Sequence, residues 1–126
     1  MKTILVVDDD RNQQLLYELE LTEEGYRVIL ARDGREALQK VQESPPDLVI
    51  LDIAMPVMNG LEALGRILSK DNKLPIILNT AYSSYKDNFM SWAADAYVVK
   101  SSDLTELKAR IKEVLKKAEQ RRHSSM

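Results

Sequence analysis

The sequence predicts an α/β domain in which helices cover both faces of a parallel sheet. Short, continuous apolar runs rich in Val and Ile alternate with segments of helical spacing, a pattern typical of strands buried on both faces. The strand–helix alternation repeats five times within 126 residues, the size of one domain. Apolar residues make up 44% of the chain, and the absence of cysteine excludes disulfides and thiolate metal sites.

Five segments are predicted as strands. The four clearest are Ile4–Val7, Leu48–Leu51, Ile76–Leu78 and Tyr97–Val99. A weaker fifth strand, Arg27–Ala31, follows the first helical segment. Each clear run is four residues or fewer, which suits a strand better than a helix.

Apolar residues at helical spacing predict the first two helices. The positions that carry the spacing are Leu15, Leu16 and Leu19 in the first helix and Ala37, Leu38 and Val41 in the second. Gly25 is suited to cap the first helix at its C-terminus. The second helix is expected to end before Pro45, because a residue that precedes proline disfavours helical backbone.

Three further helices are predicted. The third carries Leu61, Leu64, Ile67 and Leu68 with Asn59 as its N-cap, and the fourth is a short, poorly patterned segment at 84–92. The last has one apolar face, formed by Leu104, Leu107, Ile111, Val114, Leu115 and Ala118. Asp103 and Glu106 predict a capping box at its start. The domain is expected to span residues 1–120, followed by a disordered tail at 121–126.

Charge and hydropathy exclude several classes of protein. The net charge of −2 argues against a general nucleic-acid binder, which is usually basic. The apolar run at the N-terminus is too short for a signal peptide, and no stretch approaches the length of a membrane span. The cytoplasm is therefore the expected location.

Polar residues follow the predicted strands. They are Asp8, Asp9 and Asp10 after the first run, Asp52 after Leu48–Leu51, Asn79 and Thr80 after Ile76–Leu78, and Lys100 after Tyr97–Val99. The carboxyl ends of the strands of an open parallel sheet lie on one edge, where ligands bind. We therefore expect Asp8, Asp9, Asp52, Thr80 and Lys100 to converge.

Such a cluster has a defined chemistry. Carboxylates packed together need a compensating cation, and hard oxygen ligands select Mg²⁺. A carboxylate can also act as a nucleophile and carry a phosphoryl group. A divalent cation, the ammonium of Lys100 and the hydroxyl of Thr80 are the groups that stabilise the charge on a transferring phosphoryl group.

The chain resembles a response-regulator receiver domain of two-component signalling. Four motifs carry the resemblance: Ile-Leu-Val-Val-Asp-Asp at 4–9, Pro-Asp-Leu-Val-Ile-Leu-Asp-Ile-Ala-Met-Pro-Val-Met-Asn-Gly-Leu-Glu at 46–62, Thr-Ala-Tyr at 80–82 and Tyr-Val-Val-Lys at 97–100. The resemblance covers residues 3 to about 119. It implies a doubly wound, flavodoxin-like sheet of five parallel strands in the order 2-1-3-4-5 with five helices.

The resemblance also implies a metal site and a phosphorylation site. Asp52 would be the phosphoacceptor. Asp9, Asp52 and the backbone carbonyl of Ala54 would bind Mg²⁺, or Mn²⁺ in its place, and Asp8 would act through a water. Asp10 is interpreted separately, as an acidic residue whose charge favours the N-terminus of the first helix.

The remaining implied roles concern the response to phosphorylation. Thr80 would hydrogen-bond the phosphoryl group and Lys100 would pair with it, completing the catalytic set with Asp52. Tyr97 would be the switch aromatic that turns inward when Thr80 moves.

The resemblance also implies partners. A histidine kinase or a histidine phosphotransfer protein would donate the phosphoryl group, and an unspecified target protein would read the signal. The protein would act as a switch that catalyses its own phosphorylation and slow dephosphorylation. No direct contact with nucleic acid or membrane is expected, and a weak or phosphorylation-dependent homodimer fits the resemblance.

Three departures from the family pattern bear on these expectations. Ser101 stands where the family has a proline after Lys100, so this bond is either trans, with Lys100 placed differently, or cis and strained. The segment between Thr80 and Lys100 is shorter than usual. No output domain follows the receiver in this sequence, which predicts a receiver that works alone or an excised fragment.

Two alternatives remain open. A receiver that is not phosphorylated could serve only as an interaction scaffold. Asp8 and Asp10 form an Asp-x-Asp pair, with Thr80 and Lys100 later in the chain, which is the order found in small phosphatases of the haloacid dehalogenase type. That reading leaves Asp52 without a role.

Overall fold

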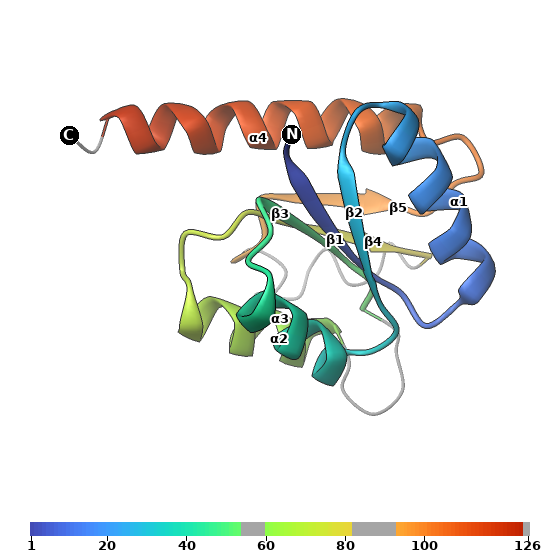
Figure 1. Cartoon of the computed structure of the whole chain (residues 1–126), viewed down its shortest axis with the longest axis horizontal. Coiled ribbons are helices and arrows are strands. Elements are labelled where there is room, and N and C mark those ends of the chain that lie inside the picture. Colours follow the sequence, from blue (N-terminus) through green and yellow to red (C-terminus); the bar gives the residue numbers. More distant parts are fainter. Residues whose placement is uncertain (54–59, 82–92, 125–126) are drawn as a thin grey trace.

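A five-stranded parallel sheet forms the centre of the molecule (Figure 1). The computed structural model describes residues 1–53, 60–81 and 93–124. The strands are β1 (Thr3–Val7), β2 (Arg27–Ala31), β3 (Leu48–Leu51), β4 (Ile76–Thr80) and β5 (Ala96–Val99). They lie in the order β2-β1-β3-β4-β5, and all four pairings are parallel, which confirms the predicted fold class and strand order.

Helices cover both faces of the sheet (Figure 1). The described residues contain four of them: α1 (Arg11–Glu23), α2 (Gly34–Glu43), α3 (Gly60–Lys70) and α4 (Thr105–Ser124). α1 and α4 lie on one face, and α2 and α3 on the other. The predicted helix at 84–92 and the predicted cap Asn59 lie outside the described residues. α4 continues through Ser124, so the expected tail at 121–126 begins inside it, and the domain boundary stays a prediction.

The core is divided by the sheet into two layers. Alternate residues of each strand point to opposite faces, so every central strand contributes to both layers. The layer under α2 and α3 is centred on Leu5, Val49, Leu51, Leu64, Ile67 and Leu78, all buried. The layer under α1 and α4 is centred on Ile4, Leu21, Ile50, Ile77, Leu107 and Ile111, also buried.

The buried face of α1 differs from the predicted one. Leu15 and Leu19, expected on the apolar face, are 45% and 61% exposed. Gln14, Tyr17 and Leu21 are buried in their place. Of the three predicted positions, Leu16 is partly buried and packs against the core. The apolar spacing thus located the helix correctly but missed the centre of its buried face, because two polar side chains on this helix find hydrogen-bond partners in the interior.

The start of α4 also differs from its prediction. Asp103 accepts hydrogen bonds from the backbone N–H and the hydroxyl of Thr105, at 2.9 and 2.6 Å. The backbone N–H of Asp103 donates to the hydroxyl of Ser101 rather than to Glu106. The prediction of a reciprocal capping box is therefore wrong. The backbone N–H of Asp103, which would have donated to Glu106, donates to Ser101 instead.

Aspartates fix the amino edge of the sheet. An Asp47 carboxylate oxygen accepts a hydrogen bond from the backbone N–H of Thr3 at 2.7 Å, and Asp95 accepts one from the backbone N–H of Ile76 at 2.9 Å. Each bond satisfies a backbone donor at the start of a strand. No helix in the described part of the chain is both long and apolar enough to cross a membrane.

Candidate functional site

The strand register brings the first and third strands to the same level at the carboxyl edge. Val7 pairs with Leu51, the last residue of β3, and Leu51 pairs with Leu78 of β4. The backbone N–H of Asp8 donates to the Ala31 carbonyl, and that of Asp52 donates to the Val7 carbonyl, both at 3.0 Å. Asp8 and Asp52 therefore leave neighbouring strands side by side.

The structure gathers Asp8, Asp9 and Asp52 into an acidic cluster. One carboxylate oxygen from each residue lies within 4.8 Å of those of the other two. Asp8 and Asp52 are buried, with 1% and 5% of their surface exposed, whereas Asp9 is exposed. Buried carboxylates need nearby positive charge or hydrogen bonds to remain ionised.

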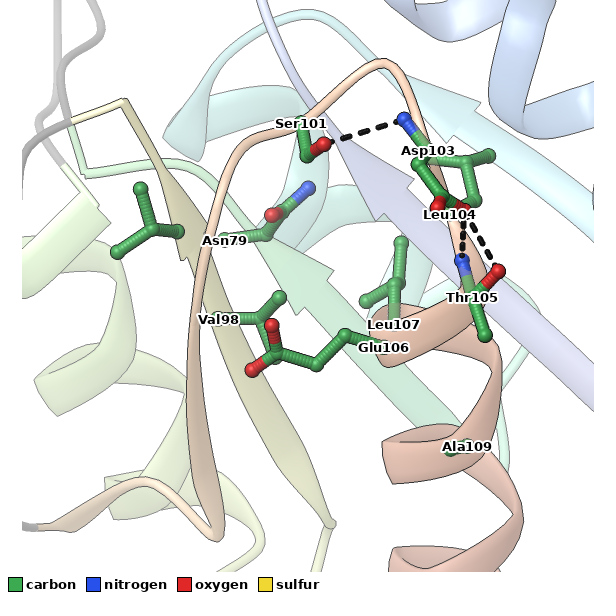
Figure 2. Close-up of a pocket in the computed structure, with 10 residues that line it drawn as sticks. Asn79, Val98, Ser101, Asp103, Leu104, Thr105, Glu106, Leu107 and Ala109 are labelled. Atoms are coloured by element: carbon green, nitrogen blue, oxygen red, sulfur yellow. Dashed lines mark hydrogen bonds between the residues drawn. The ribbon is translucent and has the colours of Figure 1, made fainter.

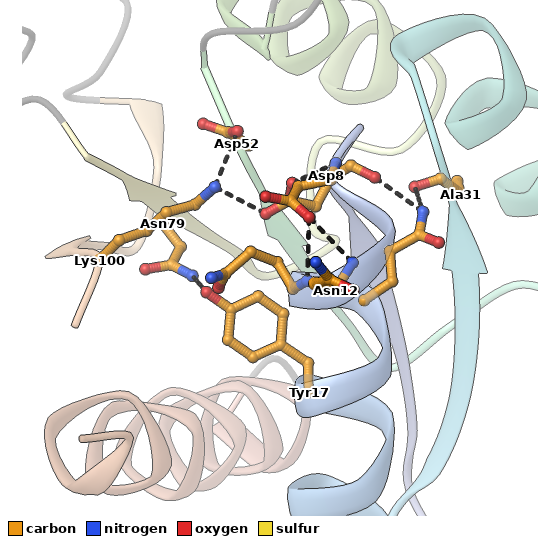
Figure 3. Close-up of polar contacts among 10 residues, drawn as sticks. Asp8, Asn12, Tyr17, Ala31, Asp52, Asn79 and Lys100 are labelled. Atoms are coloured by element: carbon orange, nitrogen blue, oxygen red, sulfur yellow. Dashed lines mark hydrogen bonds and ion pairs between the residues drawn. The ribbon is translucent and has the colours of Figure 1, made fainter. Parts of the chain in front are cut away.

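Lys100 supplies that positive charge (Figure 3). Its Nζ lies 2.7 Å from Oδ2 of Asp8 and 3.0 Å from Oδ2 of Asp52. Burial lowers the pKa of Lys100, but the hydrogen bond to Asp8 and the attraction of Asp52 outweigh burial and raise this pKa above its ordinary value. The described residues contain no cis peptide bond, so the Lys100–Ser101 bond is trans, and Lys100 still reaches both carboxylates.

Two of the three carboxylates in the β1–α1 loop, those of Asp8 and Asp10, accept hydrogen bonds from the backbone. Oδ1 of Asp8 accepts the backbone N–H of Asp10 at 2.9 Å, while Oδ2 pairs with Lys100. Asp10 is the N-cap of α1 and accepts hydrogen bonds from the backbone N–H groups of Asn12 and Gln13. The interpretation of Asp10 as a helix-terminal residue is confirmed. Among the residues that the structure describes, the Asp9 carboxylate has no hydrogen bond or ion pair.

The two predicted switch residues lie on one face of the sheet. Thr80 is fully buried at the end of β4, and its carbonyl accepts the backbone N–H of Lys100 at 2.7 Å. Tyr97 pairs with Leu78 across β4 and β5 and packs, half-buried, against the layer under α2 and α3. Thr80 stands two residues after Leu78, so it faces the same layer. Ala54 lies outside the described residues.

Three buried polar residues near the cluster were not among the residues expected to converge there. Gln14 donates hydrogen bonds to the carbonyls of Asp8 and Ala31, and Asn79 donates one to the hydroxyl of Tyr17 at 2.7 Å. Burial raises the pKa of Tyr17, and the hydrogen bond from Asn79 acts in the opposite direction. A polar residue in an otherwise apolar strand, such as Asn79 after Ile76–Leu78, is the one hint that the sequence offered.

A groove lies between the end of β5 and the start of α4 (Figure 2). It has a volume of about 370 Å³. Asn79, Val98 and Ser101 line it from the strand side, and Thr105 and Leu107 line it from the helix side. The loop that carries Lys100 therefore borders an open space as well as the acidic cluster.

The donor set of the cluster fits Mg²⁺. The groups it offers are carboxylate oxygens, the ligand type that this ion prefers, and they come from three residues. Asp9 is exposed and unpaired within the described part of the chain, so its oxygens are available to a hydrated cation. The ammonium of Lys100 balances only part of the negative charge of three carboxylates.

Known proteins are similar to this chain in sequence and fold. A family described as response regulator receiver domain matches residues 4–112. The response regulator ArlR of Staphylococcus epidermidis is 43% identical over 119 residues, which cover 93% of this chain and 54% of ArlR. The chain thus spans about half the length of the curated relatives that it matches.

Solved structures extend the comparison. The response regulator TrrA of Thermotoga maritima, in complex with Mg²⁺ and BeF, is 52% identical with a TM-score of 0.88, over 90% of this chain and 99% of TrrA. TrrA in complex with the histidine kinase ThkA gives a TM-score of 0.86 at the same identity, over 91% of this chain and 99% of TrrA. Because the family matches most of the chain and these relatives exceed 40% identity, this chain belongs to the response-regulator receiver family.

Proposed function

We propose that the chain accepts a phosphoryl group on Asp52 and that the phosphorylated form presents a different surface to a partner protein. The observation that carries this proposal is the position of Asp52. Its carboxylate lies within 3.0 Å of the Lys100 ammonium and belongs to the same cluster as Asp8 and Asp9. The nucleophile, the carboxylates that can bind a cation and the amine of Lys100 therefore lie next to one another.

Asp9 and Asp52 hold Mg²⁺ directly in this proposal, and Asp8 contributes through a water. Mn²⁺ can take the same place, because it also favours oxygen ligands. When bound, the cation offsets the negative charge of the carboxylates and of the transferring phosphoryl group. The pairing of both Asp8 oxygens with Asp10 and Lys100 supports its indirect role.

The reaction is a transfer from nitrogen to oxygen. A carboxylate oxygen of Asp52 attacks the phosphorus of a phosphohistidine, and a P–O bond forms as the P–N bond breaks. The electron pair of that bond stays on the imidazole nitrogen, and Asp52 becomes an acyl phosphate. Lys100 then pairs with a phosphoryl oxygen, where its charge stabilises the transferred group.

Thr80 and Tyr97 connect the site to the surface. The Thr80 hydroxyl is proposed to donate to a phosphoryl oxygen, and Tyr97 moves inward on the same face of the sheet. Both residues belong to neighbouring strands, since Thr80 pairs with Val99 two positions beyond Tyr97. Phosphorylation thereby shifts a pre-existing equilibrium between two packings.

The donor in this proposal is a histidine kinase or a histidine phosphotransfer protein. The complex of TrrA with the histidine kinase ThkA supports a donor of this class. We place the exchange in the cytoplasm, the location expected from the sequence. The target protein, and any weak or phosphorylation-dependent homodimer, depend on the surface that the phosphorylated form presents.

Mass spectrometry after incubation with acetyl phosphate tests the proposal. We expect one phosphoryl group on Asp52 in the presence of Mg²⁺ and none after chelation with EDTA. Asp52→Asn should abolish labelling, whereas the matched variant Asp71→Asn, which changes an exposed loop residue, should be labelled like the wild type.

Two results would contradict the proposal. Labelling of Asp8 with multiple turnovers of a phosphomonoester would favour a phosphatase of the haloacid dehalogenase type. An absence of labelling, together with partner binding that Asp52→Asn leaves unchanged, would favour a scaffold.

A further inference from the structure

We infer that Gln14 is a positioning residue that fixes the peptide between Asp8 and Asp9 for binding of Mg²⁺, an inference that rests on the proposed function. Gln14 lies in the first turns of α1 and is only 5% exposed. Its Nε2 donates to the carbonyl of Asp8 at 2.7 Å and to the carbonyl of Ala31 at 3.1 Å. One side chain thus joins the β1–α1 loop to the end of β2.

The partners of Gln14 determine the orientation of its amide. Backbone carbonyls only accept hydrogen bonds, so the NH₂ group must face Asp8 and Ala31. The opposite end, Oε1, accepts a hydrogen bond from the guanidinium of Arg11 at 3.3 Å, and guanidinium groups only donate. Each half of the amide therefore meets groups of the complementary kind, which leaves one favourable arrangement.

The carbonyl held by Gln14 belongs to the peptide that links two residues of the acidic cluster. A peptide unit is planar, so fixing the Asp8 carbonyl also fixes the direction of the Asp9 N–H and the position of its Cα. The Asp9 carboxylate has no hydrogen-bond partner among the described residues, so its placement depends on this backbone. The backbone N–H of Asp8 donates to the same Ala31 carbonyl, which strengthens the connection.

Mg²⁺ is sensitive to such positioning because it requires nearly ideal octahedral geometry. Groups that orient metal ligands without touching the metal typically contribute about 10–100-fold to affinity. A side chain without donors at position 14 should therefore weaken Mg²⁺ binding even in a protein that remains folded.

Isothermal titration of Mg²⁺ into the wild type, Gln14→Met and Gln42→Met tests the inference. Methionine matches glutamine in length but donates no hydrogen bond, and Gln42 is exposed on α2, remote in sequence from the loop. We expect Gln14→Met to raise the Kd for Mg²⁺ at least about tenfold, and Gln42→Met to leave this Kd unchanged. Urea unfolding of each variant measures stability separately.

The outcomes separate the inference from the proposed function. A residue with a purely structural role would lower stability but leave the Kd of the folded protein unchanged, and this result would overturn the inference alone. A wild-type protein that binds no Mg²⁺ would overturn the proposed function and the inference with it.

A measurement on the wild type covers the case in which Gln14→Met does not fold. NMR should show the Gln14 side-chain NH₂ protons protected from solvent exchange and shifting as Mg²⁺ is added, while those of Gln42 exchange rapidly and do not shift. Gln14 signals that exchange rapidly and ignore Mg²⁺ would refute the inference.

Discussion

Lys100 stabilises two buried carboxylates at once, and this double contact makes it energetically important. Its Nζ contacts both Asp8 and Asp52. Removing one partner of a buried ion pair typically costs about 3–5 kcal/mol, because the remaining charge stays buried without compensation. We therefore expect Lys100→Met to lower the free energy of unfolding by about 3–5 kcal/mol in urea denaturation at neutral pH. Lys116→Met, at an exposed position of α4, is the control and should change it little.

The same residue should make stability depend on pH in the alkaline range. The folded-state pKa of Lys100 lies above its ordinary value of 10.5, since attraction to Asp8 and Asp52 outweighs burial. The stabilisation is therefore complete below 10.5 and is lost as the pH rises through the folded-state pKa. We expect the difference in unfolding free energy between wild type and Lys100→Met to be constant near neutral pH and to shrink as the pH rises above 10.5. A difference that shrinks on acidification alone would disprove this assignment.

The hydrogen bond between Asn79 and Tyr17 joins β4 to α1 in the interior, where an unpaired polar group is costly. Tyr17→Phe should destabilise the protein by about 1–3 kcal/mol, because the Asn79 amide loses its partner. Replacing both residues, with Tyr17→Phe and Asn79→Leu, should recover much of this loss, since no polar group is then left unpaired.

A double-mutant cycle in urea measures this coupling, with Tyr26→Phe as the control. Among the described residues, Tyr26 has no side-chain hydrogen bond, so loss of its hydroxyl should change the unfolding free energy little. Additive effects of the two core substitutions would show that the Asn79–Tyr17 bond contributes nothing.

At the scale of elements, the three consecutive aspartates before α1 have different roles. Asp8 pairs with Lys100, Asp9 is exposed in the acidic cluster, and Asp10 caps the helix. Asp10→Ala should cost about 1 kcal/mol of stability through loss of the N-cap. Asp9→Asn should leave stability nearly unchanged but weaken Mg²⁺ binding strongly. Thermal denaturation of both variants measures stability, and calorimetric titration measures Mg²⁺ binding. If Asp9→Asn lowered stability and Asp10→Ala weakened Mg²⁺ binding, these assignments would be wrong.

Elements were easier to predict than the faces they bury. Continuous runs such as Leu48–Leu51 located strands correctly, because residues buried on both sides of a sheet are all apolar. The buried face of α1 was predicted only in part, because Gln14 and Tyr17 are buried through hydrogen bonds to partners distant in the sequence. The convergence of the acidic cluster could be predicted, because the carboxyl ends of parallel strands lie at one edge of the sheet. The hydrogen bonds from Gln14 to backbone carbonyls could not be predicted, because every residue has a carbonyl and the sequence does not indicate which one is the acceptor.

At the scale of the whole molecule, Mg²⁺ binding is expected to stabilise the entire domain. Any ligand that binds only the folded state raises stability by an amount that grows with its concentration, about 2.7 kcal/mol at a hundred times its Kd. Because the sheet joins all the elements into one unit, a single thermal transition should move upward as Mg²⁺ is added and return with EDTA. Asp9→Asn should show a much smaller shift, and an equal shift would place the ion elsewhere.

The two edges of the sheet use the same residue type in opposite ways. At the amino edge, Asp47 and Asp95 bind backbone N–H groups at the start of β1 and β4. At the carboxyl edge, Asp9 keeps its carboxylate open to solvent. The hydrogen bonds at the amino edge fix the register of the strands at that end. The carboxyl edge can therefore hold several negative charges close together while the strands stay aligned.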